Sequence, residues 1–497
     1  MGIVKRQSIR NAAINYAGVM LGYVNKVLLF QQWLTEAEYG LVELLIAFMV
    51  IGSEISQLGV SKLIIRFFGH FQRDPQKEGQ FTTLVLLYGT GGFLLICSLI
   101  WLGKDGILQL YEAESALFAS YMVYVLPMIF AHLLYRMSSS LARAQFITVL
   151  PMFAWELLLR MWHLVSILIY VFGEIELETF IQLLVVGYFL PSCLLLIYLA
   201  TTGRLRLSWQ FTQLHRRIIK VLIGFALFAS LSEATMVLVN KTDMAMLGAM
   251  LGEAKAGAYA LAFYFSMLVF IPYRSLNAIV VPLIATHMRS KNLPEVGNLF
   301  RKTSAMNLVI GSWVFIGIWT SIDEFYALFP KHAEGKWAVF FLGISAMVQI
   351  TAGLQRSIIV NSRYYRFDLF ANLGLLTVVV LSNYLLIPLF QVPGAAIATA
   401  GSLSLYSLIG VGHVYYRFRI HPFSWRSLGT VLLCAAVMIL GQFLPELGNP
   451  WLNILGHSVI VTVVFLPLAI RFRLAPELNT VLEKQWKQLQ NKLFPRK

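Results

Sequence analysis

The sequence predicts an all-α polytopic membrane protein with about fourteen transmembrane helices, and two observations lead to this prediction. The composition is the first: 58% of the 497 residues are hydrophobic and 13% are charged, whereas an average soluble domain carries about 25% charged residues. The second is that the charged residues gather in the gaps between long apolar runs. A surface with so few charges has to face lipid, so the net charge of +15 indicates membrane topology rather than nucleic-acid binding.

Fourteen apolar runs of about 20 residues, each long enough to cross a bilayer, give the expected spans. Most of the 39 Lys and Arg residues fall in every second gap, and most of the acidic residues in the others. By the positive-inside rule both termini are cytoplasmic, and we expect a multi-pass protein of the bacterial cytoplasmic membrane. The expected spans are 9–30, 38–60, 81–102, 119–140, 150–172, 178–200, 219–240, 256–283, 303–321, 337–360, 367–387, 393–414, 427–444 and 451–470.

An internal repeat divides the chain into two halves. The segment Leu34–Leu41 (LTEAEYGL) recurs without a gap as Leu251–Ala258 (LGEAKAGA), which aligns the first expected span with the seventh. An offset of six spans preserves orientation, so the pattern predicts two six-helix bundles in parallel repeat around a central cavity. The expected domains are 1–215 and 216–420 for the bundles, 421–472 for two additional spans, and 473–497 for a cytoplasmic amphipathic tail.

Four segments carry a resemblance to a known family. They are LTEAEYG at Leu34–Gly40, GVSKLIIRFF at Gly59–Phe68, the long stretch Asn240–Ala262, and VPGAAIATAGS at Val392–Ser402. With the basic start and the asparagine-containing first span, the chain resembles the oligosaccharide flippases of the multidrug/oligosaccharidyl-lipid/polysaccharide exporter superfamily. The resemblance implies translocation of polyprenyl-pyrophosphate-linked oligosaccharide from the inner to the outer leaflet by alternating access, for surface polysaccharide biosynthesis.

Ionisable residues inside the spans are the candidate site, because each costs about 2.5–3.5 kcal/mol to insert. The cations Lys26, Arg160 and Arg274 are expected to bind the diphosphate headgroup, with Arg356 a further candidate, since fixed cations neutralise an anion in a low-dielectric layer. The resemblance supports cations in the first and eighth spans, where Lys26 and Arg274 lie. The candidate coupling groups, which could exchange a proton as the cavity alternates, are Glu54, Glu156, Glu233 and Asp243.

Each candidate also has a structural interpretation. Glu156 and Arg160 are spaced i, i+4 and could neutralise each other, whereas Lys26 and Arg356 are near enough to an interface to snorkel. Glu43, near an outer boundary, is expected to be solvated. The glycine pair Gly18 and Gly22 predicts a close helix contact.

Two other functions stay open on the sequence alone. A cation-coupled multidrug exporter of the same superfamily would need a site rich in carboxylates and aromatic residues. A membrane-embedded sugar polymerase or ligase would need a substantial outer loop with catalytic groups, which the short loops do not offer, so we expect no enzyme.

The sequence also predicts which partners and cofactors the chain uses. Three cysteines dispersed in apolar runs give no metal cluster, and no cofactor is expected. The expected partners are membrane lipids and the anionic lipid-linked oligosaccharide, with no nucleic acid. Coupling to a proton or sodium gradient and contacts with polysaccharide-assembly proteins stay open.

Overall fold

The computed structural model describes residues 2–211, 216–446 and 448–480, and every regular element in this part of the chain is a helix. The expected all-α class is therefore confirmed. The chain forms two compact units, the first ending at Ala260 and the second beginning at Leu261, within helix α13. This boundary at residue 260 reflects which residues pack together. The boundary expected after residue 215 reflects where the sequence repeat begins again. The expected tail helix lies largely outside the described residues.

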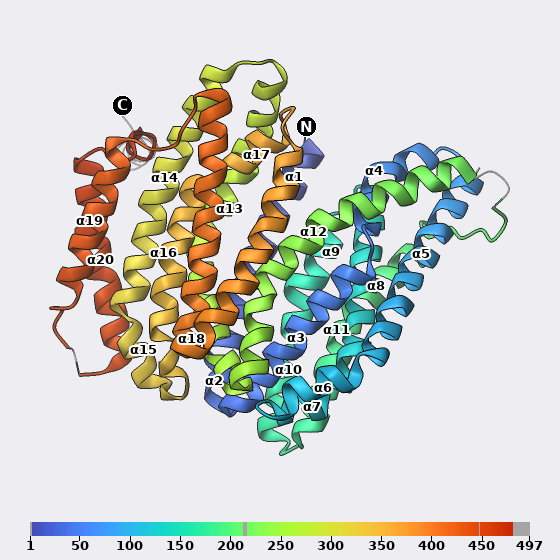
Figure 1. The fold of residues 1–497 in the computed structure, drawn as a ribbon, viewed down its shortest axis with the longest axis horizontal. Helices are drawn as coiled ribbons and strands as arrows, with labels where there is room; N and C mark the ends of the chain where they lie inside the picture. Colours follow the sequence, from blue (N-terminus) through green and yellow to red (C-terminus); the bar gives the residue numbers. More distant parts are fainter. Residues whose placement is uncertain (1, 212–215, 447, 481–497) are drawn as a thin grey trace, which may run out of the picture. The chain divides into compact units, whose positions relative to one another are not determined.

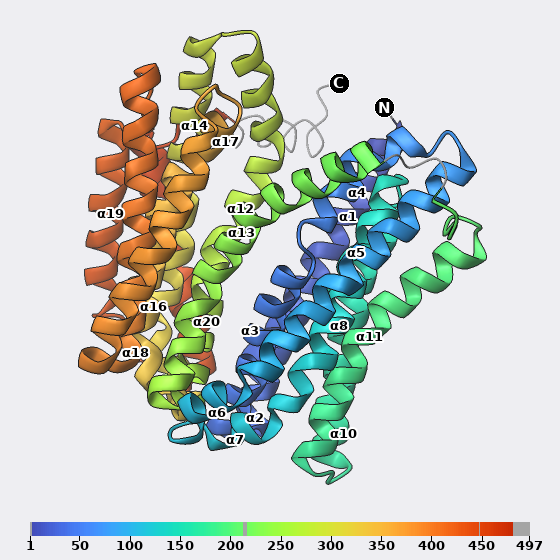
Figure 2. The ribbon, with the colours of Figure 1, turned by 45° about the vertical axis from the view of Figure 1, so that its right-hand side comes forward.

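The first unit is built from the helices up to α12 and the start of α13 (Figure 1). In order these are α1 (Gly2–Tyr23), η1 (Val24–Leu29), α2 (Phe30–Trp33), α3 (Glu36–Ser56), α4 (Val60–Phe71), α5 (Pro75–Leu102), α6 (Lys104–Glu112), α7 (Ala116–Tyr121), η2 (Met122–Tyr124), α8 (Val125–Ala144), α9 (Val149–Phe153), η3 (Ala154–Leu158), α10 (Leu159–Phe172), α11 (Leu177–Thr201), α12 (Arg216–Leu251) and α13 (Glu253–Arg289). Figure 2 shows α3, α5, α8 and α11 running alongside one another, and α3 and α11 both pack against α8.

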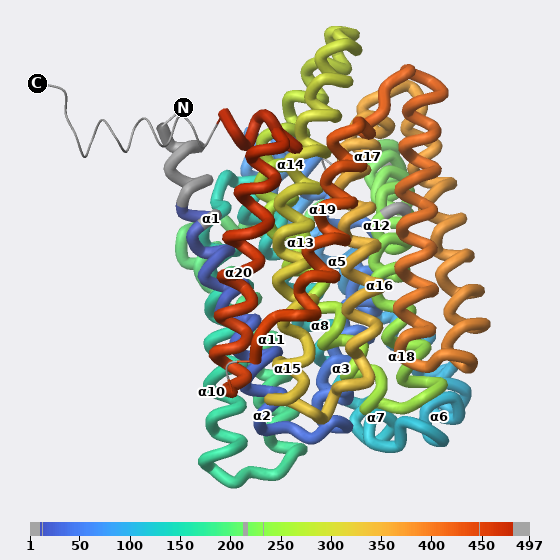
Figure 3. The backbone as a smooth tube through the Cα atoms, turned by 90° about the vertical axis from the view of Figure 1, so that its left-hand side faces the viewer, coloured from blue at the N-terminus to red at the C-terminus, as the bar shows by residue number. Residues whose placement is uncertain are grey.

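The second unit continues from α13 and ends with two helices that pack on α14. Its further elements are α14 (Leu293–Thr320), α15 (Ile322–Leu328), η4 (Pro330–Gly335), α16 (Lys336–Ala352), α17 (Gln355–Val360), α18 (Arg366–Phe418), α19 (Trp425–Gly441) and α20 (Pro450–Arg471). Figure 3 shows α19 and α20 beside α14, where Trp313 Nε1 donates to Thr462 Oγ1 at 3.0 Å and His457 Nδ1 lies 3.0 Å from the Thr320 carbonyl oxygen.

Twelve helices in the described residues are long and apolar enough to cross a membrane, which makes this a multi-pass membrane protein. The expected fourteen is approximate for two reasons. Helix α18 runs through two expected spans and breaks only at Gln391, whose φ of 55° is not helical and which lies between Pro388 and Pro393. Helix α19 has 17 residues and is too short to be counted. Reading α18 as two helices and adding α19 recovers the expected spans.

The first repeated turn folds by local capping, and the two repeated turns pack together. At the first, the Thr35 hydroxyl accepts from the Glu38 N–H at 3.3 Å, and the Glu38 carboxylate accepts from the Thr35 N–H at 2.8 Å, which starts α3. Gly40 follows and lies so close to the start of α13 that an added Cβ would stand 1.7 Å from the carbonyl oxygen of Glu253. Gly257, the equivalent glycine of the second turn, would place a Cβ 3.1 Å from the Gly40 nitrogen. The glycines of the repeat therefore allow the first turns of α3 and α13 to pack closely against each other.

Candidate functional site

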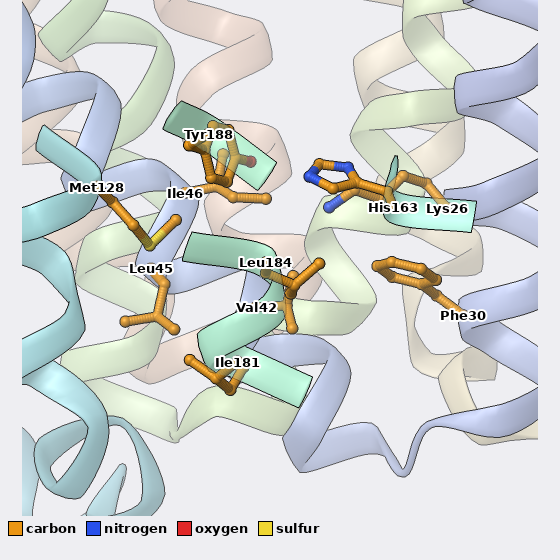
Figure 4. A pocket seen from close by; sticks show the side chains of 10 residues that line it. All are labelled: Lys26, Phe30, Val42, Leu45, Ile46, Met128, His163, Ile181, Leu184 and Tyr188. Carbon is orange, nitrogen blue, oxygen red and sulfur yellow. The ribbon is translucent and has the colours of Figure 1, made fainter. Parts of the chain in front are cut away.

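A small buried pocket in the first unit brings Lys26 beside His163 and Tyr188 (Figure 4). Its other lining residues are mostly aliphatic, and its volume is about 10 Å³, room for about one water molecule. A cation in such surroundings is costly unless another group compensates its charge. The neighbours of Lys26 therefore decide what this pocket can do.

Lys26 is compensated by Glu43 of α3, which accepts a hydrogen bond from the Lys26 ammonium. Both residues are buried, with exposed fractions of 9% for Lys26 and 1% for Glu43. The expected solvation of Glu43 is wrong, because its carboxylate is buried and meets the ammonium of Lys26 in η1 rather than water. The snorkelling interpretation of Lys26 fails for the same reason, since its ammonium ends on a carboxylate inside the unit.

Arg160 and Glu156 form the ion pair that their i, i+4 spacing predicts, with Nη2 to Oε2 at 2.6 Å. Glu156 lies in the π-helical turn η3, and Lys26 lies in the π-helical turn η1. A π-turn inserted into an α-helix is frequently a functional feature, because it shifts the facing of the residues that follow. The turn η1 lies in the span of Lys26, and the turn η3 lies in the span of Arg160, the two headgroup candidates of this unit.

Gly18 and Gly22 allow α1 to approach this second span closely. An added Cβ on Gly18 would stand 2.5 Å from the Glu156 carbonyl oxygen, and one on Gly22 would stand 2.9 Å from Arg160 Nη1. Asn25 Nδ2 also donates to the Arg160 carbonyl at 2.7 Å. The close helix contact predicted from this glycine pair is thus confirmed, and it places Arg160 near Lys26.

Two further cations gather around Lys26. Lys241 of α12 and Arg160 both lie close enough to Lys26 to interact with its charge. In the described part of the chain, Glu43 pairs with Lys26 and Glu156 pairs with Arg160. A group of basic side chains such as this one can accommodate an anion.

Glu54 and Glu233, both predicted as coupling groups, come together in a second cluster. Glu54 Oε2 accepts from Arg136 Nη2 at 3.0 Å, and Glu233 Oε1 lies 2.9 Å from Lys62 Nζ. The two carboxylates are near enough to repel each other. Two acids and two bases make the cluster neutral, and one buried oxygen of each carboxylate has no hydrogen-bond partner among the described residues.

Asp243 lies near the end of α12. It is fully buried in α12 and accepts hydrogen bonds from the Tyr259 hydroxyl and, at 2.8 Å, from the N–H of Met244. Tyr259 belongs to the start of α13, so Asp243 holds the end of α12 against the next helix.

The two candidates in the second unit differ sharply. Arg356 forms a bidentate ion pair with Asp368, with Nε to Oδ1 at 3.1 Å and Nη2 to Oδ2 at 3.2 Å. The Tyr406 hydroxyl donates to the same carboxylate at 3.3 Å. Arg274 is exposed on α13, and its only contact given for the described residues is from Nη2 to the Met267 sulfur at 3.4 Å. Among the described residues, Arg274 has no carboxylate partner.

Sequence reasoning missed four of these groups. Lys241 and Lys62 lie just beyond expected spans, and Arg136 and Asp368 lie within a few residues of the end of one, so none of the four is among the sequence candidates. Helices α12 and α18 instead run past the expected ends, to Leu251 and across Gln391. The spacing of Arg136 four residues after His132 in an apolar run was the one available signal, whereas nothing in the sequence marks the π-turns.

Comparison with known proteins agrees with this arrangement of helices. A family model described as polysaccharide biosynthesis protein matches residues 4–288. A structure of the lipid II flippase MurJ in an inward closed conformation has a TM-score of 0.71 at 15% identity, covering 94% of this chain and 99% of that one.

Two further solved structures are transporters of the multidrug type. An inward-facing multidrug resistance MATE family transporter of the MOP superfamily has a TM-score of 0.65 at 12% identity, covering 86% of this chain and 98% of that one. A point mutant of the Vibrio cholerae MATE transporter VcmN has a TM-score of 0.55 at 15% identity, covering 88% of this chain and all of that one. No curated protein matches the chain significantly. The chain belongs to the polysaccharide biosynthesis protein family and has the fold of the MOP-superfamily transporters.

Proposed function

We propose that this protein translocates polyprenyl-pyrophosphate-linked oligosaccharide from the inner to the outer leaflet of the bacterial cytoplasmic membrane, by alternating access and for surface polysaccharide assembly. The family match and the fold shared with a lipid II flippase support a flippase of this superfamily. In the proposed topology both termini are cytoplasmic. The protein acts as a transporter and not as an enzyme.

The observation that carries the proposal is Arg274, an exposed cation in a membrane-spanning helix with no carboxylate partner among the described residues. Inserting an unneutralised guanidinium into a span costs free energy, so such a residue is a functional candidate. A diphosphate headgroup supplies the missing charge, and its oxygens match the two parallel donors of an arginine. The gathering of Lys241 and Arg160 around Lys26 in the first unit also suits an anionic substrate.

Lys26 and Arg160 would meet the headgroup by exchanging partners. In the unloaded protein each is paired with a carboxylate, Glu43 or Glu156, which makes the buried cations tolerable. An entering diphosphate competes for the same donors, and Lys241 adds a third cation to hold it. Arg356 is a weaker candidate, because its guanidinium already donates two hydrogen bonds to Asp368, which Asn372 also contacts.

Glu54 and Glu233 are the proposed coupling groups. Each lies between two membrane helices, pairs with one cation, and keeps one carboxylate oxygen without a hydrogen-bond partner among the described residues. Proton or sodium binding at these oxygens would change the balance of the neutral cluster and weaken the Lys62–Glu233 link between α4 and α12. If ion binding breaks the Lys62–Glu233 ion pair, it can shift the equilibrium between two arrangements of these helices and so couple ion binding to helix movement.

A cation-coupled multidrug exporter shares this fold, but the charges disfavour it here. A site for cationic drugs requires carboxylates whose charge is not already neutralised. Glu43, Glu54, Glu156 and Glu233 each pair with a Lys or Arg of the first unit.

The test is replacement of Arg274 by Ala in a strain lacking the wild-type gene, with surface polysaccharide and membrane protein level both measured. We expect Arg274→Ala to abolish polysaccharide delivery at normal protein level, and Arg274→Lys to retain part of it. Arg289→Ala is the matched control, since Arg289 is an exposed arginine in the last turn of the same helix. Normal delivery in Arg274→Ala would remove the headgroup role, and drug hypersensitivity without a polysaccharide defect in the gene deletion would favour the exporter.

A further inference from the structure

A second basic pocket lies at one end of the second unit, apart from the candidate transport residues. It is formed by the first turns of α14 and by the segment that follows α18, and it has a volume of about 280 Å³. Ligand pockets for drug-sized molecules begin at about 300 Å³, so this one suits a smaller group. Figure 1 shows the start of α14 and the end of α18 at the same end of the unit.

The lining of this pocket is suited to an anion. Arg301, Arg419 and His421 contribute its polar side chains, and no acidic residue lines it. Arg301 Nε donates to the carbonyl of Gly297 at 3.4 Å, which directs its guanidinium along the first turns of α14. The Arg419 guanidinium lies 5.6 Å from the centre of the Tyr415 ring. Two arginines lining one space suit a phosphate, because a guanidinium offers parallel donors to adjacent phosphate oxygens.

The backbone at Arg419 gives independent support. Arg419 caps α18 in the left-handed region, with φ of 59° and ψ of 31°. Glycine is the residue normally favoured at this position, because a Cβ is strained there. A long cationic side chain kept at a strained position is a sign that the side chain is used.

The surroundings of the pocket point to the membrane interface. Tyr416, Phe423 and Trp425, on either side of Arg419 in sequence, are exposed to 68%, 43% and 86%. Tyrosine and tryptophan, here Tyr416 and Trp425, concentrate where lipid headgroups meet the acyl region. The three basic segments at this end of the unit, 284–302, 361–366 and 415–426, are those predicted to lie in the cytoplasm, where anionic lipids attract basic residues.

We propose that this pocket binds the phosphate of an anionic phospholipid headgroup in the inner leaflet. Arg301 and Arg419 hold the phosphate, His421 contributes a further polar contact, and the exposed aromatic residues lie at headgroup depth. Inorganic phosphate shares the chemistry of the headgroup but lacks the acyl chains that would keep it at the interface. The site is thus a lipid site on the outside of the bundle and does not take part in translocation.

The experiment measures binding of headgroup-labelled phosphatidylglycerol to the purified full-length protein in a neutral detergent, with phosphatidylcholine and inorganic phosphate as competitors. We expect unlabelled phosphatidylglycerol to displace the probe, and the other two compounds to displace it far less well. Arg301→Gln and Arg419→Gly are each expected to weaken binding by about tenfold, because each removes hydrogen bonds to a charged group.

Arg419→Gly also separates binding from folding, since glycine is the favoured residue at that backbone conformation. Its melting temperature without lipid should be no lower than that of the wild type. The matched control is Arg363→Gln, which removes an exposed arginine from the same end of the unit but outside the pocket, and binding should be unchanged. Three results would each overturn the proposal: equal competition by phosphatidylcholine or inorganic phosphate, wild-type binding in both pocket variants, or an equal loss in the control.

Discussion

Replacing Lys26 by Met is expected to destabilise the protein because it removes the cation that pairs with the buried carboxylate of Glu43. The Glu43 side chain is 2% exposed and its ion-pair partner is the Lys26 ammonium. Removing one partner of a buried ion pair costs about 3–5 kcal/mol, whereas replacing both partners by apolar residues is often neutral or stabilising. Lys26→Met should therefore lower the free energy of unfolding by about 3 kcal/mol or more.

The double variant Lys26→Met, Glu43→Leu tells a structural role from a transport role. Both new side chains fit the mostly aliphatic lining of the pocket, so the double variant should recover most of the lost stability. If Lys26 also binds the headgroup, the double variant stays defective in surface polysaccharide although it is stable. Denaturant unfolding in detergent, followed by tryptophan fluorescence, measures the first quantity, and polysaccharide in a deletion strain measures the second.

Two outcomes would refute this reasoning. Wild-type stability in Lys26→Met would mean that the charge of Glu43 is compensated without Lys26. Recovery of both stability and polysaccharide delivery in the double variant would show that the ion pair is structural and that Lys26 does not bind substrate.

Three further predictions follow from close contacts. Gly18→Ala should destabilise the protein by about 1–3 kcal/mol, because the added Cβ meets the backbone of Glu156. Gly22→Ala should destabilise it less, because its Cβ meets the end of the flexible Arg160 side chain. The melting temperatures of the two variants test this, and equal melting temperatures would contradict it. Gly40→Ala should prevent normal accumulation in the membrane, while Gly91→Ala, with nothing within 4 Å of its Cβ, should accumulate normally, as membrane immunoblots would show. Asp368→Asn should lower the free energy of unfolding by about 1.5–3 kcal/mol, since it weakens charged hydrogen bonds, and an unchanged unfolding midpoint would count against the pair.

The positions of the spans could be predicted from the sequence because each depends on local properties. An apolar run of sufficient length is helical in a bilayer whatever its neighbours are, since its backbone groups must be paired internally. The Thr35 and Glu38 pair likewise caps α3 within four residues of sequence. The same reasoning placed Glu156 and Arg160 on one face of a helix, and the structure shows them paired.

The partners of the other charges could not be predicted in this way. Lys26 and Glu43 lie on different helices, and whether they meet depends on how each helix is rotated about its axis. Membrane helices are apolar on nearly every face, so their periodicity carries little information about rotation. Arg136 and Glu54 illustrate the same limit, because Arg136 meets Glu54 only through the packing of α8 against α3.

The sequence by itself determined the all-α class, the span positions, the close approach at Gly18 and Gly22, and the short set of charged residues inside the membrane. These follow from hydrophobicity, capping and residue size, which act over a few neighbouring positions. Only the tertiary structure decided which of those charges are neutralised: Lys26, Arg160 and Arg356 have carboxylate partners, and Arg274 has none in the part of the chain described. The physical reason is that an ion pair between helices depends on helix rotation and on the π-turns η1 and η3, and local sequence specifies neither.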